Sequence, residues 1–259
     1  STLTAEATCT KDVCTDKCAP AGSGCPPDSI ALPLVDFDSP GPPDYSFKKR
    51  AQNAQGFGQC EVLCNGTSCD NRCVFPASDF EDLLWQVKQG GTLTLNNVIT
   101  YVTGNIDLRG GRHLVVKGAL VADDNIKIGE KYSWTRGGQK DEGFSQITII
   151  QPTAQSPSGL LTKRKIDFGL YSSFPADLDI EGVIYANDEV SFVSIPDTSF
   201  DVKGGIIARK LSLVSLWQGL NITLDNDIIR YGLGYRIDGG EIKPTFSPVI
   251  TIDHWEESY

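Results

Sequence analysis

The chain has 259 residues, of which 40% are hydrophobic and 22% are charged, and its formal net charge is −10. Its apolar runs are only a few residues long, whereas a membrane-spanning helix needs about 20, so a spanning helix within the chain is excluded. The acidic balance argues against nucleic acids or pectate-like polyanions as partners, and the basic runs at 48–50 and 163–165 are too short to reverse it. Because the chain starts at Ser1 and has no methionine, we expect a mature or excised fragment, with any leader or membrane anchor upstream.

The N-terminal part of the chain is rich in cysteine and proline. Its eight cysteines form two clusters, Cys9, Cys14, Cys18 and Cys25 in the first and Cys60, Cys64, Cys69 and Cys73 in the second. An even number of cysteines in an irregular segment favours disulfides, which persist only outside a reducing cytoplasm, although their pairing cannot be deduced. The alternative is one or two four-cysteine zinc sites, but neighbouring cysteines within a cluster never have the two-residue spacing of a zinc knuckle. We therefore predict a disulfide-stapled module at 1–75 and a second domain at 76–259.

The segment from Ser78 to Gly90 predicts a helix. Ser78 and Glu81 have the spacing of a capping box, and Gly90 can take the left-handed conformation that ends many helices. The apolar residues fall on one face, and they are Phe80, Leu83, Leu84 and Val87. An amphipathic helix here would cover the unpaired strand edges at the start of a stacked β-domain.

A short phrase recurs in the second domain. Residues 118–128 read GALVADDNIKI, residues 182–192 read GVIYANDEVSF and residues 204–213 read GGIIARKLSL. Each phrase predicts two short strands that meet at a corner, with glycine before the first strand and polar residues at the bend. The second and third copies start 22 residues apart, which is the size of one coil of a β-solenoid, where each repeat buries its apolar face only against its neighbours.

Other short strands are expected outside the three copies, at 92–95, 98–102, 105–108, 113–116, 146–150 and 249–252. The predicted fold is therefore all-β, a single-stranded β-solenoid (parallel β-helix) with one capping α-helix and an irregular disulfide-rich N-terminal module. The alternative is a β-sandwich of similar hairpins, but no two-residue hairpin signal lies between the paired strands of the phrases. The aromatic tail, 255–259, could close the far end of the solenoid or contact a partner subunit, and we favour the cap.

The polar corners carry the candidate metal ligands. Stacking would bring together carboxylates from successive corners, namely Asp123, Asp124, Asp188, Glu189, Asp225 and Asp227. Oxygen ligands of this kind suit calcium, which would be the one cofactor of the chain. The alternative is that Asp and Asn only favour turns there. With bound calcium, an arginine such as Arg109, Arg112 or Arg136 could abstract a proton in a polysaccharide lyase.

A loop from Glu130 to Gly143 interrupts the strand pattern and is the candidate binding loop, through Tyr132, Trp134 and Arg136. A decorated surface loop without a role is the alternative. No nucleophile elbow, phosphate-binding loop or metal-type histidine pair is found, and His113 and His254 are interpreted as structural or surface residues. No catalytic residue is therefore assigned.

The phrases at 182–186 and 204–208, with the ending at 222–225, resemble the C-terminal β-solenoid of surface proteins of the type IV pilus, the PilX-like minor pilin group. The resemblance covers about residues 92 to 255. It implies an extracellular, non-enzymatic solenoid that acts in pilus assembly, adhesion or surface contact and is carried by an N-terminal membrane-anchoring helix. The chain departs from that pattern because it lacks the hydrophobic helix and has the additional cysteine module.

The predicted function is that of an extracellular structural or adhesive protein at the cell surface or pilus, without enzymatic activity. Its partners would be other surface or pilus subunits or surface glycans, and it would meet a membrane only through a segment outside this chain. A generic envelope or surface-layer protein is one alternative. A calcium-dependent polysaccharide lyase or hydrolase is the other.

Overall fold

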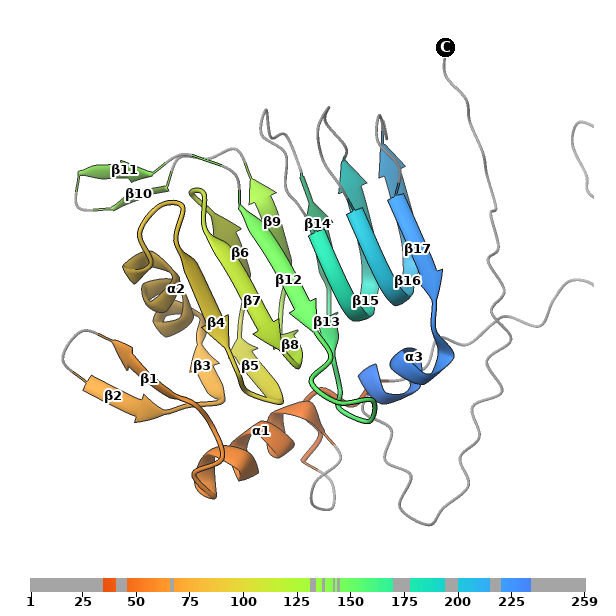
Figure 1. Cartoon of the computed structure of the whole chain (residues 1–259), viewed down its shortest axis with the longest axis horizontal. Coiled ribbons are helices and arrows are strands. Elements are labelled where there is room, and N and C mark those ends of the chain that lie inside the picture. The colour runs from red at the N-terminus through yellow and green to blue at the C-terminus, as the bar shows by residue number, and fades with distance from the viewer. Residues whose placement is uncertain are drawn as a thin grey trace, which may run out of the picture.

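The structure is a computed structural model that describes residues 35–40, 46–65, 68–130, 134–136, 138–141, 143, 145–169, 178–193, 200–214 and 220–233. Most of this part of the chain is β-strand, and 13 of its strands join one large sheet. Figure 1 shows this sheet curled into a half-barrel. The prediction of a mostly β protein is confirmed. Among the described helices, none is long and apolar enough to cross a membrane.

Within the described residues, the strands of the large sheet stack in parallel as three ladders. The first ladder contains β4 (Thr92–Leu95), β7 (His113–Lys117), β12 (Gln146–Ile150) and β17 (Leu220–Leu224). The second contains β3 (Val74–Pro76), β5 (Ile99–Thr103), β8 (Ala119–Ala122) and β13 (Gly159–Thr162). The third contains β6 (Ile106–Arg109), β9 (Ile126–Glu130) and β14 (Lys165–Phe168). Two long strands, β15 (Leu178–Val193) and β16 (Phe200–Val214), run through all three ladders.

The recurring phrases occupy equivalent places in these ladders. Residues 118–128 span β8 and β9, and the two later copies lie in β15 and β16. The first and second copies are not neighbours, because β13 and β14 lie between them. β13 and β14 are themselves a further copy of the phrase, at 159–168. The sequence analysis did not identify it because Thr162 stands where the other phrases have alanine. The other strand predictions agree with the structure to within one residue, and the one at 249–252 lies outside the described residues.

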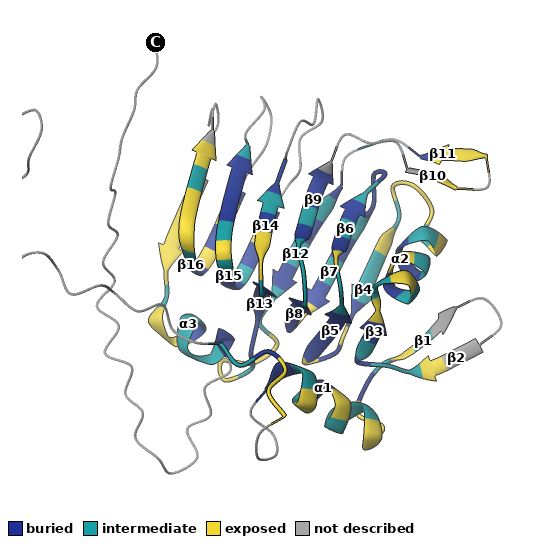
Figure 2. Cartoon of the chain, turned by 180° about the vertical axis from the view of Figure 1, so that it is seen from behind, coloured by how far each residue is buried: buried dark blue, intermediate teal, exposed yellow. Residues whose placement is uncertain are grey.

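Two apolar clusters hold the sheet. The inner cluster lies inside the curl. There the Phe168 and Phe192 rings stack with centroids 4.8 Å apart, and the Phe200 ring meets Phe192 edge to face at 5.5 Å. The outer cluster covers the second ladder, whose Tyr101 and Tyr185 point away from the curl. Because both faces of this ladder are buried, its strands are continuous apolar runs rather than alternating ones. In Figure 2 the buried residues of β8 and β13 are dark blue.

The outer cluster is completed by α1 (Phe47–Gly56), a helix that the sequence analysis did not predict. Ser46 caps it, since its side-chain oxygen accepts a hydrogen bond from the Lys49 N–H at 3.2 Å. The described segment 35–40 lies beside it, and the Phe37 ring packs against Tyr185 at 5.9 Å between centroids.

The predicted helix at 78–90 is present as α2 (Ala77–Gln86), but its predicted ends are wrong. Pro76 is the N-cap, and the Ser78 hydroxyl donates to the Asp79 carboxylate instead of closing a capping box. The apolar face of α2 enters the inner cluster through Phe80, Leu83 and Leu84. In Figure 1, α2 lies at the end of the sheet, beside β4 and β6.

Three smaller elements flank the sheet. They are the hairpin of β1 (Val62–Asn65) and β2 (Ser68–Asn71), the hairpin of β10 (Trp134–Arg136) and β11 (Gln139–Asp141), and the helix α3 (Asn226–Gly232). A disulfide joins Cys60 to Cys73, and the register of β1 and β2 places Cys64 opposite Cys69. The first cysteine cluster lies outside the described residues, so the disulfide-rich module stays a prediction.

Candidate functional site

Charged side chains gather where the second ladder turns into the third. We call this row the charged corner, and its residues are Asp123, Asp124, Lys163, Arg164, Lys165, Asp188, Glu189 and Lys210. The backbone bends there because polar residues interrupt each apolar strand, as between β8 and β9. The bend brings side chains from successive strands onto one outer edge of the sheet.

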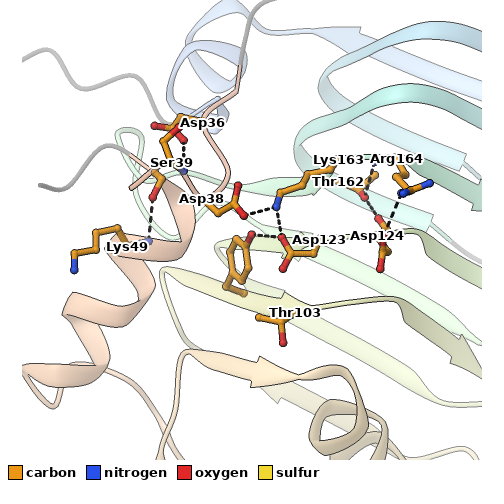
Figure 3. A network of polar contacts seen from close by, with 12 residues as sticks. Asp36, Asp38, Ser39, Lys49, Thr103, Asp123, Asp124, Thr162, Lys163 and Arg164 are labelled. Carbon is orange, nitrogen blue, oxygen red and sulfur yellow. Dashed lines mark hydrogen bonds and ion pairs between the residues drawn. The ribbon is translucent and has the colours of Figure 1, made fainter. Parts of the chain in front are cut away.

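The first part of the charged corner is a partly buried hydrogen-bond network (Figure 3). The Lys163 Nζ lies 2.5 Å from Asp123 Oδ1 and 2.7 Å from Asp38 Oδ2. The hydroxyl of buried Tyr101 donates to the same Asp123 oxygen at 2.5 Å. Lys48 of α1 lies over the Tyr101 ring, 5.8 Å from its centroid. The network therefore connects segment 35–40 and α1 to β5 and to the turns that precede β9 and β14.

The pKa values of this network favour fixed protonation states. Burial and the hydrogen bond to Asp123 raise the pKa of Tyr101 far above its ordinary value, so the phenol keeps its proton and acts as a donor. Burial lowers the pKa of Lys163, but its hydrogen bonds to Asp123 and Asp38 outweigh that effect and the net direction is upward. A neutral phenol and a charged ammonium hold Asp123 in place.

The next pairs continue along the same edge. Arg164 Nε lies 3.2 Å from Asp124 Oδ1, although both side chains are about half exposed, at 63% and 45%. The buried Thr162 hydroxyl donates to the Asp124 carbonyl oxygen, and the Arg164 N–H donates to the Thr162 hydroxyl at 3.2 Å. Thr162, which stands in place of alanine in this copy of the phrase, thus connects the turn at Asp124 with the turn at Arg164.

Glu189 is the most heavily bonded carboxylate of the charged corner. Lys165 and Lys210, from the strands on either side, lie 3.0 and 2.8 Å from its oxygens, and the Ser212 hydroxyl donates to it at 2.6 Å. The hydrogen bonds from Lys210, Ser212 and Lys165 lower the pKa of Glu189 from its ordinary 4.5 to about 2. Glu189 therefore joins three consecutive strands at once.

The structure separates the candidate calcium ligands. Asp123 and Asp124 lie on one side of the Lys163–Lys165 stretch, and Asp188 and Glu189 lie on the other. Asp225 accepts from the N–H groups of Asp227 and Ile228 at 3.1 Å each and so caps α3. In the described part of the chain, no three His, Cys, Asp or Glu side chains gather as a metal-binding group. The calcium site stays a prediction that this geometry does not favour.

The candidate binding loop is a hairpin, β10–β11, tied to α2. Arg136 pairs with Asp82 of that helix. Trp134 is in β10, and Tyr132 lies outside the described residues. At the base of the hairpin, Asp141 forms an ion pair with Arg112, and both side chains are buried. This loop is therefore anchored to α2 and, at its base, to Arg112.

The arginines considered as lyase bases are held by other groups. Arg112 is 1% exposed and donates to carbonyl oxygens at the end of α2, so it faces the interior. Arg109 lies 3.1 Å from Glu81. His113 contacts the Thr148 hydroxyl at 3.0 Å, and His254 lies outside the described residues.

The sequence analysis missed Tyr101, Asp38 and the role of residues 163–165. The sequence does contain a signal for residues 163–165. Residues 159–165 follow the pattern of the phrase, with a glycine, two apolar residues, one small residue and a polar bend. No comparable signal announces Asp38, which lies far away in sequence. What the charged corner does chemically is to connect neighbouring strands through opposite charges.

No family model, curated protein or solved structure matches this chain. The resemblance to minor pilins therefore rests on the phrases alone.

Proposed function

We propose that this chain is a rigid, non-enzymatic module of the cell surface or pilus, built as a short β-solenoid that presents its edges for adhesion or assembly. The observation that carries the proposal is the charged corner, where cations and carboxylates alternate from strand to strand. Charges used in this way hold a scaffold together. A catalytic site would instead direct them toward a substrate.

The register supports the solenoid part of the proposal. Register partners are 20 residues apart between β5 and β8, 21 between β4 and β7 and 22 between β15 and β16. The separation is larger, at 33 residues, between β7 and β12, where the hairpin β10–β11 lies in the intervening chain. β15 and β16 pair with each other through all three ladders, with one register shift between Ala186 and Glu189. A chain that winds in coils of this size, with β10–β11 as an insertion, accounts for the pattern.

The ion pairs between neighbouring strands also support the proposed rigidity of the sheet. Glu181 and Lys203, at the end of the first-ladder stretches of β15 and β16, lie 2.7 Å apart and add a second line of ion pairs. A single exposed pair contributes little, about 0–1 kcal/mol. Glu189 is 15% exposed and shared by two lysines, so its network is less screened by solvent. Together with a second ladder buried on both faces, these links favour a rod that does not bend.

The proposed location and partners follow from other features. The Cys60–Cys73 disulfide agrees with an oxidising, extracellular compartment. The resemblance to minor pilins favours pilus subunits as partners, and surface glycans are the other class that we propose. The hairpin β10–β11, with Trp134 and Arg136, is our proposed contact region because it projects beyond the sheet (Figure 1).

Surface biotinylation of intact source cells, followed by shearing of their pili, tests this proposal. We expect the protein in the biotinylated fraction and in the sheared pilus fraction. A chain with Trp134→Ala and Arg136→Ala should bind purified pili or cells more weakly than a matched Thr135→Ala control. Protein that is labelled only after lysis contradicts the proposal.

The enzyme alternative is tested on the same preparation. Uronic-acid polymers are incubated with the chain, with and without calcium, and unsaturated products are measured. We expect no turnover in either condition. Calcium-dependent turnover that is lost in Glu189→Gln or Asp123→Asn overturns the non-enzymatic assignment.

A further inference from the structure

The far end of the sheet leaves apolar side chains of the inner face uncovered. These side chains are exposed by 44% to 50%, and they are Leu211, Leu213, Ile222 and Leu224. We call this surface the open end. Their register partners one strand inward, Val190, Phe192 and Val202, are at most 2% exposed. Side chains at equivalent inner positions are thus buried in one strand and exposed to solvent in the next.

The opposite end of the sheet shows what such a position requires. There α2 fills the inner face with Phe80 and Leu84, each 1% exposed. At the far end α3 follows β17, but it packs outside the curl. Gly232 of α3 lies against Val183 on the outer face of the second ladder, and Ile229 lies against Gly205. The inner face therefore stays open beyond β16 and β17 in the described part of the chain.

We propose that the C-terminal segment, 234–259, docks over the open end as its cap. The segment continues from Leu233, which is 4% exposed and packs in the outer cluster with Val183 and Tyr185 of β15. The 26 residues that follow could extend about 3.3 Å each, far more than the width of a few strands at about 4.8 Å per strand. The open end is within reach of the chain itself.

The sequence of the C-terminal segment suits this role. Residues 249–252 read VITI, so Ile250 and Ile252 share one side of an expected strand while Thr251 faces the other. In the described residues, the stretch 210–214 of β16 pairs only with β15, so its other edge can receive a strand. Strand addition would place Ile250 and Ile252 over Leu211 and Leu213.

Charge complementarity favours the same occupant. Beyond the expected strand the segment is acidic, with Asp253, Glu256 and Glu257 in its last seven residues. The bend of β16 beside the open end carries Arg209 and Lys210, both exposed, with the Lys210 side chain at 67%. A second copy of the chain would need to displace or avoid this covalently attached segment, which has the higher effective concentration.

Hydrogen exchange on the disulfide-intact full chain tests the proposal. The variants are a truncation after Leu233, the substitutions Ile250→Asp and Ile252→Asp, and Thr251→Asp as the matched control. We expect exchange of the amides at 210–214 to accelerate about tenfold or more in the truncation and in both isoleucine variants, and to be unchanged in the control. Exchange in β8 and β9 should stay slow, which shows that the rest is folded. If the truncated chain does not fold, the full-length variants decide.

Two results would overturn the proposal. In one, the amides at 210–214 exchange equally fast in the full chain and in Ile250→Asp and Ile252→Asp, so that the C-terminal segment leaves the open end uncovered. In the other, their protection rises with protein concentration, sedimentation shows a dimer, and Leu211→Ser dissociates it. A second copy is then the occupant. An Arg209→Glu variant should lower the protection of the amides at 210–214. The protection that remains should depend less on salt concentration than in the wild type.

Discussion

The guanidinium of Arg112 and the carboxylate of Asp141 lie 2.5 Å apart with side chains only 1% and 4% exposed, so a buried ion pair joins the residue that precedes β7 to the hairpin β10–β11. Arg112 also donates through Nε to the carbonyl oxygens of Leu84 and Val87, at 2.8 and 3.0 Å. The last carbonyl groups of a helix have no partner within the helix. Arg112 therefore satisfies the end of α2 and fixes the cap of the sheet.

Replacing Arg112 by methionine should destabilise the protein by about 3–5 kcal/mol, because Asp141 would remain buried without its partner. Urea unfolding measures this loss. The matched control is Arg136→Met, which breaks the half-exposed pair with Asp82 and should cost at most about 1 kcal/mol. Equal losses in the two variants would show that burial of the Arg112 pair has no special role.

Acid should weaken the protein through Glu189. Because its pKa is about 2 in the folded chain against an ordinary 4.5, its stabilising contribution is complete above pH 4.5 and is lost as the pH falls toward 2. Glu189→Gln should flatten the fall in melting temperature over this range. Asp188→Asn is the matched control, because it removes a charge from the same corner and leaves the Glu189 hydrogen bonds intact. An acid profile of Glu189→Gln that equals the wild-type one contradicts the network.

The glycine that opens the second-ladder strand should not tolerate a side chain. At Gly159 the backbone has φ +139°, and a Cβ would lie 2.0 Å from the Val183 carbonyl oxygen. Gly159→Ala should therefore cost about 3 kcal/mol in the free energy of unfolding. Gly56→Ala at the end of α1, where a Cβ meets no atom within 4 Å, should change it by less than about 1 kcal/mol. A tolerated Gly159→Ala would mean that the start of β13 packs less closely against β15 than described.

Loss of the Cys60–Cys73 disulfide should reduce stability by about 2–4 kcal/mol, since the bond closes a loop of 13 residues. Both cysteines are buried against the outer cluster. Unfolding of a Cys60→Ala, Cys73→Ala chain is compared with that of the oxidised wild type. If the oxidised wild type and the double variant unfold at the same denaturant concentration, the bond does not stabilise the connection between the chain after α1 and the start of β3.

The strands were predictable because local pattern decides them. Alternating residues in β12 and β7 face the inner cluster and solvent in turn, and the sequence shows that period directly. The order of the strands was harder. Thr162 follows the rule of a small residue at the corner but not the expected alanine, so the copy that separates two others was not seen.

Long-range partners explain what else was missed. Asp38 meets Lys163 only through the fold, and no spacing in the sequence announces a pair of residues so far apart. The carboxylates that suggested calcium were read without the cations stacked beside them. A row of acidic corners predicts a metal only if the intervening strand carries no positive charge, and Lys163, Arg164 and Lys165 carry three.

The central claim, that the chain is a rigid module of the cell surface or pilus, is tested most directly by immunogold electron microscopy of intact source cells. The proposal predicts gold particles on the outer surface or along pili of unpermeabilised cells. Labelling that appears only after permeabilisation would contradict it.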